Sequence, residues 1–184
     1  SQVMGAVSAA SDTQPNSGSN QYCPPDSATA VCVGPVGEWK LDEKTGTTAN
    51  DTTGNGNSLT LTNSPTWTNA KYNAGINFPG SNAHLTRADD ADFDFGAGSS
   101  FTLQTWFKHT TASAAETILV KHNEAGYKIN MESDGDITCG IDYDSTYSPT
   151  DSVTSTAATY DDGKWHHIAC VKNANTSLTL YIDG

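Results

Sequence analysis

Residues 127–144 read YKINMESDGDITCGIDYD. On both sides of Asp134-Gly135, apolar residues recur at every second position, which is the alternation of half-buried β-strands. An Asp-Gly pair between two such runs is a strong signal for a tight hairpin turn. This stretch therefore predicts two antiparallel strands joined at Asp134-Gly135.

Similar short runs, separated by turn residues, follow one another along most of the chain. They predict strands at residues 36–43, 58–63, 74–80, 83–88, 100–109, 116–122, 127–133, 137–144, 165–173 and 177–184. We expect no helix after residue 33, so the predicted fold class is all-β, a two-sheet antiparallel sandwich. Residues 1–33 differ in composition and predict an N-terminal arm with a short helix, ahead of one domain at residues 34–184.

The composition excludes several classes of partner. The 184 residues include only nine Lys and Arg, and the formal net charge is −12. A nucleic-acid backbone or an anionic membrane surface would repel such a chain. No run is long and apolar enough to span a bilayer, so we expect no membrane insertion in this segment.

The cysteines are Cys23, Cys32, Cys139 and Cys170. Their spacing is unlike that of a zinc site. The simplest pairing joins Cys23 to Cys32 and Cys139 to Cys170, although four cysteines allow three connectivities. For Cys139 and Cys170 the alternative is a pair of buried free thiols. Disulfides would indicate an oxidising compartment, outside the cytosol.

Three blocks carry a resemblance to a known family. They are GPVGEWKLDEKTGTTANDTTGNGNSLTLTNSPTW (34–67), GINFPGSNAHLTRADDADFDFGAGSSFTLQTWFK (75–108) and DGKWHHIACVKNANTSLTLYIDG (162–184). In this order they resemble a laminin G-like domain of the concanavalin A-like lectin/glucanase superfamily, which is related to pentraxins. The resemblance implies a jelly-roll sandwich, usually extracellular or on the cell surface, that binds glycans or proteins and frequently holds a structural calcium ion.

Domains of this family normally continue beyond the strand that contains YIDG, whereas this sequence stops at Gly184. The resemblance therefore implies a jelly roll that is incomplete at its C-terminus. Two alternatives follow from it. Either the sequence is partial, or a neighbouring chain completes the sheet by strand addition at its open edge.

The stretch NDTTGNGN, residues 50–57, is a candidate calcium loop. Asp51, Asn55 and Asn57 offer side-chain oxygens, and Gly54 and Gly56 free the backbone to turn its carbonyls inward. One carboxylate is too few for calcium, so further ligands would have to come from elsewhere in the fold. The alternative is a Gly-Asn turn between two strands, without an ion.

Alternation also predicts a binding face. Gln104, Trp106 and Lys108 share one face of their strand, and His167 and Tyr181 fall on one face of theirs. If these strands are neighbours, the five side chains line a single sheet surface. An aromatic ring flanked by hydrogen-bonding groups is a common way to hold a sugar. The alternative for Trp106 is burial under a loop or against the second sheet.

Catalysis is not expected. Glu132, Asp134 and Asp136 alternate like the carboxylates of a glucanase, but the turn at Asp134-Gly135 prevents them from sharing a face. Together with the resemblance, this implies a secreted or surface-displayed, non-catalytic module that binds glycan or protein in adhesion. The rival hypothesis is a structural subunit of an extracellular filament or pilus-like assembly, and a glycoside hydrolase is a distant third.

Overall fold

The computed structural model describes residues 34–80, 82–110, 112, 114–122, 126–142, 151–156 and 159–184. The predicted N-terminal arm at 1–33 and the Cys23–Cys32 pairing lie outside these residues. The chain divides into two compact units between Asp89 and Asp90, and each is described by itself.

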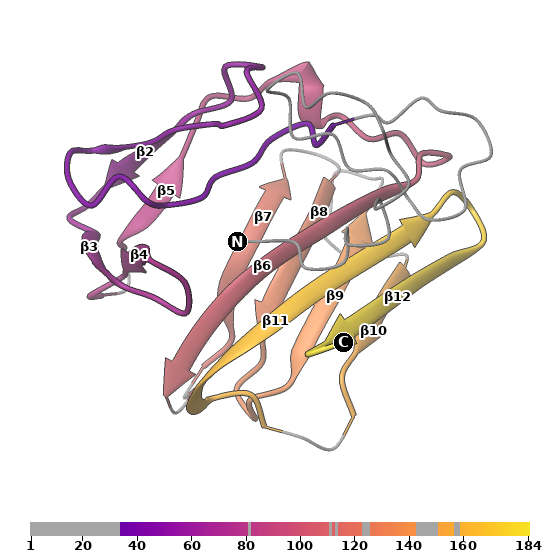
Figure 1. Ribbon diagram of the computed structural model, residues 1–184. Helices are drawn as coiled ribbons and strands as arrows, with labels where there is room; N and C mark the ends of the chain where they lie inside the picture. The colour runs from indigo at the N-terminus through magenta and orange to yellow at the C-terminus, as the bar shows by residue number, and fades with distance from the viewer. Residues whose placement is uncertain are drawn as a thin grey trace, which may run out of the picture. The chain divides into compact units, whose positions relative to one another are not determined.

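The second unit contains two antiparallel sheets, with strand orders β10-β9-β8-β7 and β12-β11-β6. Figure 1 shows β6, β11 and β12 lying across the four-stranded sheet. A 3-10 turn at Ala91–Phe93 precedes the strands. These are β6 (Phe101–Thr110), β7 (Glu116–His122), β8 (Gly126–Met131), β9 (Ile137–Asp142), β10 (Asp151–Thr154), β11 (Asp162–Asn173) and β12 (Ser177–Ile182).

The hairpin between β8 and β9 is confirmed. The Gly135 N–H donates to the Glu132 carbonyl at 3.0 Å, and the Glu132 N–H donates to the Asp136 carbonyl at 2.8 Å. Gly135 has φ 86°, in the left-handed region that glycine tolerates best. A Cβ there would lie 2.7 Å from a carboxylate oxygen of Asp161, so both backbone geometry and space require glycine.

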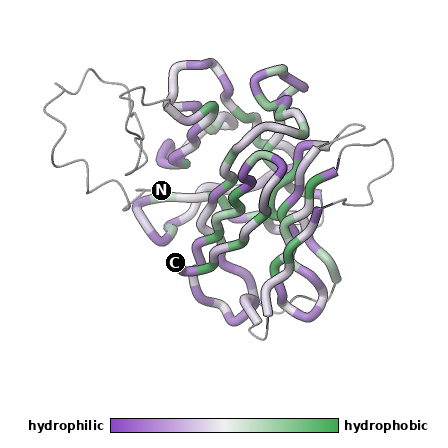
Figure 2. The backbone as a smooth tube through the Cα atoms, turned by 90° about the vertical axis from the view of Figure 1, so that its right-hand side faces the viewer, coloured by the Kyte–Doolittle hydropathy of each residue, from purple (hydrophilic) through white to green (hydrophobic). Residues whose placement is uncertain are grey.

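The core lies between the two sheets. Along the strands of this unit, apolar and polar positions alternate (Figure 2), so each strand turns one face inward. The residues that share the interior are Leu103, Tyr127, Ile129, Met131, Ile137, Cys139, Ile141, Ile168 and Cys170.

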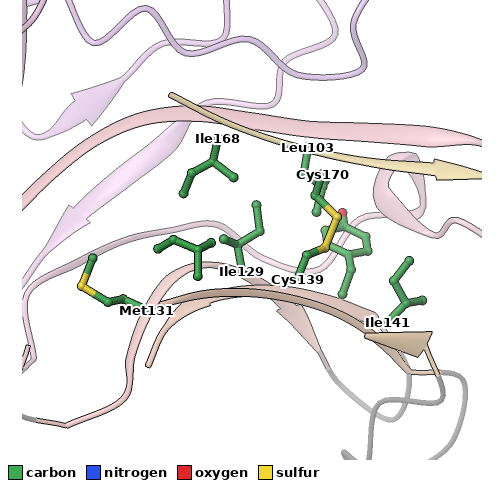
Figure 3. Packing of buried hydrophobic residues seen from close by; sticks show 9 residues of the cluster. Leu103, Ile129, Met131, Cys139, Ile141, Ile168 and Cys170 are labelled. Atoms are coloured by element: carbon green, nitrogen blue, oxygen red, sulfur yellow. A yellow bond between two sulfur atoms is a disulfide. The ribbon is translucent and has the colours of Figure 1, made fainter. Parts of the chain in front are cut away.

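A disulfide joins Cys139 of β9 to Cys170 of β11, and both residues are fully buried. Because β9 and β11 belong to different sheets, this bond ties the two layers together through the core (Figure 3). The predicted pairing is confirmed, and the alternative of two free thiols is wrong.

One buried cation binds the loops at the end of the three-stranded sheet where β6 begins and β11 ends. Lys172 of β11 is only 3% exposed, and its ammonium donates to the carbonyls of Ala97, Ser99 and Ala174. These carbonyls belong to the loop before β6 and the turn after β11. Burial of a charge requires such partners, so Lys172 holds both connections against the strand.

The first unit contains shorter pairings. One sheet has the order β1-β2-β5, and β3 pairs with β4, all antiparallel. Their bounds are β1 (Thr48–Ala49), β2 (Leu59–Thr62), β3 (Thr66–Asn69), β4 (Ala74–Asn77) and β5 (His84–Thr86).

The strand expected at residues 36–43 is not formed. Within it, only Trp39 makes a β-bridge, with Asp51. Leu41 and Lys44 have φ values of 56° and 61°, which no strand contains. The chain turns at these residues, so the apolar pattern of this stretch does not continue into an extended ladder.

We predict that removing the disulfide lowers the free energy of unfolding by about 3–4 kcal/mol, the loop-closure value for a separation of 31 residues. The double variant Cys139→Ala/Cys170→Ala, compared with wild type in a urea titration, measures this. An unchanged free energy of unfolding would contradict the structural role of the bond.

Candidate binding face

The pairing of β6, β11 and β12 fixes which side chains share the outer surface of this sheet. Opposite Trp106 of β6 lies His167 of β11, and Gln104 lies opposite Ala169, which in turn faces Tyr181 of β12. Leu103, Ile168 and Cys170 alternate with these residues and point into the core. Since neighbours along a strand point to opposite faces, the remaining residues point away from it.

All the residues predicted to bind a ligand therefore lie on one face. Tyr181 is 49% exposed, Gln104 and Lys108 are exposed, and Trp106 and His167 are half-buried. The rings of Trp106 and His167 lie 5.2 Å apart between centroids and are tilted by 52°.

Trp165 is a member of this face that sequence reasoning missed. It lies opposite Lys108 across the β6–β11 ladder and is two positions from His167 on the same strand. The period-2 alternation along β11 was the signal that could have found it. We call the outward side chains of these strands the Trp106 face, comprising Gln104, Trp106, Lys108, Trp165, His167 and Tyr181.

His167 supplies a neutral imidazole to this face. Burial lowers its pKa, and the charge of Asp183 opposes this without cancelling it, so the pKa lies below the ordinary value of 6.5. A neutral ring has one N–H donor and one acceptor nitrogen. Beside Trp106 it can therefore both donate and accept hydrogen bonds at neutral pH.

In the first unit, Asp51 organises the loop that was predicted to hold calcium. Its Oδ1 accepts the N–H groups of Glu38 and Thr53 at 3.1 and 2.9 Å. Its Oδ2 accepts the Thr53 hydroxyl at 2.7 Å and the Asn57 N–H at 3.0 Å. Burial raises the pKa of Asp51, but these four hydrogen bonds outweigh it and lower the pKa.

The other two predicted ligands lie close by. The side-chain amides of Asn55 and Asn57 both donate to the Val36 carbonyl at 2.9 Å. The Asn57 carbonyl accepts the indole N–H of Trp39 at 2.7 Å. The loop is thus tied to residues 36–39 by its own hydrogen bonds.

Both carboxylate oxygens of Asp51 already accept two hydrogen bonds each, so a calcium ion bound there would have to displace donors. Over the described part of the chain, no cluster of three or more His, Cys, Asp or Glu residues is arranged to hold a metal. Calcium binding by Asp51, Asn55 and Asn57 stays a prediction from the sequence.

The alternating acids after β8 serve the hairpin turn. Asp134 Oδ1 accepts the Asp136 N–H at 3.2 Å, and Asp136 Oδ1 accepts the Ser155 hydroxyl at 2.8 Å. These contacts give the two carboxylates structural roles in the turn.

A comparison with models of known protein families shows to which superfamily the chain belongs. Residues 79–184, more than half of the chain, match the family described as the concanavalin A-like lectin/glucanases superfamily. The chain belongs to this superfamily. The predicted resemblance is confirmed over that range, which includes every strand of the Trp106 face.

Solved structures with this lectin-type fold include two from clostridial proteins. The binding domain of Paraclostridial Mosquitocidal Protein 1 matches with a TM-score of 0.65 at 14% identity, over 80% of this chain and 38% of that one. An S-layer domain-containing protein from Clostridium thermocellum matches with a TM-score of 0.55 at 22% identity, over 79% of this chain and 67% of that one. The chain thus spans well under half of the first structure. No curated protein sequence matches it.

We predict that Asp51→Asn lowers the free energy of unfolding by about 1–3 kcal/mol, since an amide nitrogen then faces donors that the carboxylate satisfied. The loss should be equal in EDTA and in excess calcium. Urea titration under both conditions measures it. Asp42→Asn is the matched control, because its amide oxygen can still accept the Ala74 N–H. A loss that appears only in calcium would show instead that Asp51 ligates the ion.

Proposed function

We propose that this chain is a secreted or surface-displayed, non-catalytic module that binds a saccharide on the Trp106 face, in adhesion to glycan-bearing surfaces. The observation that carries the proposal is the strand register. It collects two tryptophans, a tyrosine and several hydrogen-bonding groups on one sheet surface.

The chemistry of the face suits a sugar ring. The apolar face of a pyranose packs on an indole, while its hydroxyls need donors and acceptors at the edge of the ring. Trp106 supplies the platform, with Trp165 diagonally across from it. Gln104 and neutral His167 both donate and accept hydrogen bonds, and Lys108 donates.

The setting supports an extracellular location. A buried disulfide is typical of oxidising compartments, and the acidic charge disfavours nucleic acid as a ligand. In the described part of the chain, no helix has the length and apolar character needed to cross a membrane. One structure of similar fold is the binding domain of Paraclostridial Mosquitocidal Protein 1, which accords with a binding role here.

We predict that Trp106→Ala weakens saccharide binding by at least roughly tenfold, because one aromatic platform contributes about 1.5 kcal/mol. A glycan array selects the ligand, and calorimetry measures the dissociation constants. Tyr72→Ala is the control, since Tyr72 is 43% exposed but belongs to the other unit. If no glycan binds wild type at millimolar concentration, the saccharide proposal fails.

A second candidate is a subunit of an extracellular assembly that pairs with another copy of this chain. Among the described strands, β10 and β12 are edges of their sheets. Between them runs a groove of about 240 Å³, lined by Val153, Thr154, Ser155, Thr156, Tyr160, Leu180 and Ile182. Exposed strand edges favour strand addition by another chain. Another structure of similar fold comes from an S-layer domain-containing protein.

The two candidates differ in how the protein behaves without a ligand. An assembly subunit should sediment as larger species as its concentration rises, whereas a lectin-like module need not. Sedimentation velocity over a wide concentration range measures this. A monomer at every concentration would exclude self-assembly and leave saccharide binding unaffected.

A further inference from the structure

His166 lies behind the Trp106 face with both ring nitrogens against carboxylates. It is 9% exposed and points inward from β11. Its Nδ1 lies 2.8 Å from Asp183 Oδ2, and its Nε2 lies 3.1 Å from Asp162 Oδ1. The rings of Phe107 and Tyr160 pack against the imidazole, with centroids 5.8 and 5.2 Å away.

This geometry requires a proton. Only the imidazolium donates through both nitrogens, whereas the neutral ring has one N–H and one lone pair. In the neutral state, one of the two carboxylates would face that lone pair with no bond between them. An imidazole lone pair repels a carboxylate oxygen that the N–H had held, so loss of the proton would weaken the hold of His166 on either Asp162 or Asp183.

Asp183 connects His166 to the ligand-binding surface. Its second oxygen accepts the His167 N–H at 2.9 Å, and its own N–H donates to the His167 carbonyl at 2.9 Å. His167 is the residue whose ring contacts Trp106. One carboxylate therefore bridges the buried imidazole and the backbone beneath the binding face.

We propose that protonated His166 is a positioning residue for the Trp106 face, holding Asp183 and through it the backbone of His167. The saccharide-binding part of this inference rests on the proposed function. Loss of the His166 proton weakens the hold on Asp183, which follows β12. The position of His167 beside Trp106 then becomes less well fixed. Saccharide affinity then falls as the pH rises.

The charged groups around the His166 ring favour its protonated form. Burial lowers the pKa of His166, but the hydrogen bonds and charges of Asp183 and Asp162 outweigh it, so the pKa is raised. The Lys164 side chain, together with His166, holds the pKa of Asp162 far below its usual range. Burial raises the pKa of Asp183, but its bonds to His166 and His167 lower it overall. Tyr160 is the titratable neighbour from the segment before β11.

The pH window follows from these directions. The contribution of His166 is complete below its unfolded pKa of about 6.5 and is lost as the pH rises through the higher folded value. The contributions of Asp162 and Asp183 are present above 3.8 and are lost as the pH falls through their lowered values. The hydrogen bonds of protonated His166 to ionised Asp162 and Asp183 are therefore fully formed between about pH 4 and 6.5.

Nitrogen NMR of the full chain, without ligand, tests the positioning step. We expect both ring nitrogens of His166 to carry protons at about pH 6.5. The His167 amide and the Trp106 indole N–H should then shift with the His166 midpoint, which lies above the midpoint of the His167 ring. A singly protonated His166 at that pH would overturn the proposal. The proposal would also be overturned if the signals of the His167 amide and the Trp106 indole N–H did not change as His166 titrates.

The variants separate positioning from simple stability. His166→Gln and Asp183→Asn should each lower saccharide affinity several-fold below pH 6.5 and remove its decline at higher pH. His109→Gln is the control, because His109 also pairs with a carboxylate, that of Glu116 at 3.1 Å. Variants that keep the wild-type pH profile of binding would overturn the proposal. If no saccharide binds, the proposed function fails while the NMR test still decides the role of His166.

Discussion

The register between β6 and β11 is the constraint on which the rest of the second unit depends. Ile168 and Cys170 of β11 point into the core, and the disulfide to Cys139 holds that strand against the opposite sheet. A slip of one residue would reverse every side chain of the strand, placing Trp165 and His167 inside. The binding face and the core are therefore two consequences of one alignment.

Much of this unit could be predicted because its signals are local. Asp134-Gly135 specifies a turn by its own backbone preferences, and alternation assigns each side chain to a face without knowledge of its partners. The shared surface of Trp106 and His167 required only that their strands be neighbours. Trp165 lies two positions before His167 on β11, so the same alternation places it on this face.

The first unit was predicted less well because its structure depends on contacts between distant residues. The spacing of Asp51, Asn55 and Asn57 resembles a set of metal ligands, but it does not reveal hydrogen-bond partners at Val36 and Glu38. Likewise, the apolar pattern of residues 36–43 does not show that Leu41 adopts a positive φ. The sequence therefore identifies the polar residues of the loop but not the hydrogen bonds that hold them.

The four tryptophans provide the most direct test of the binding face. Trp106 and Trp165 lie on it, whereas Trp39 and Trp67 belong to the first unit, where their indole N–H groups donate to the carbonyls of Asn57 and Gly46. Titration of the nitrogen-labelled protein with the saccharide selected on the array follows all four indole signals in one spectrum. We predict that the signals of Trp106 and Trp165 shift with a common dissociation constant while the other two stay in place. Shifts confined to Trp39 and Trp67 would contradict the assignment of binding to this face.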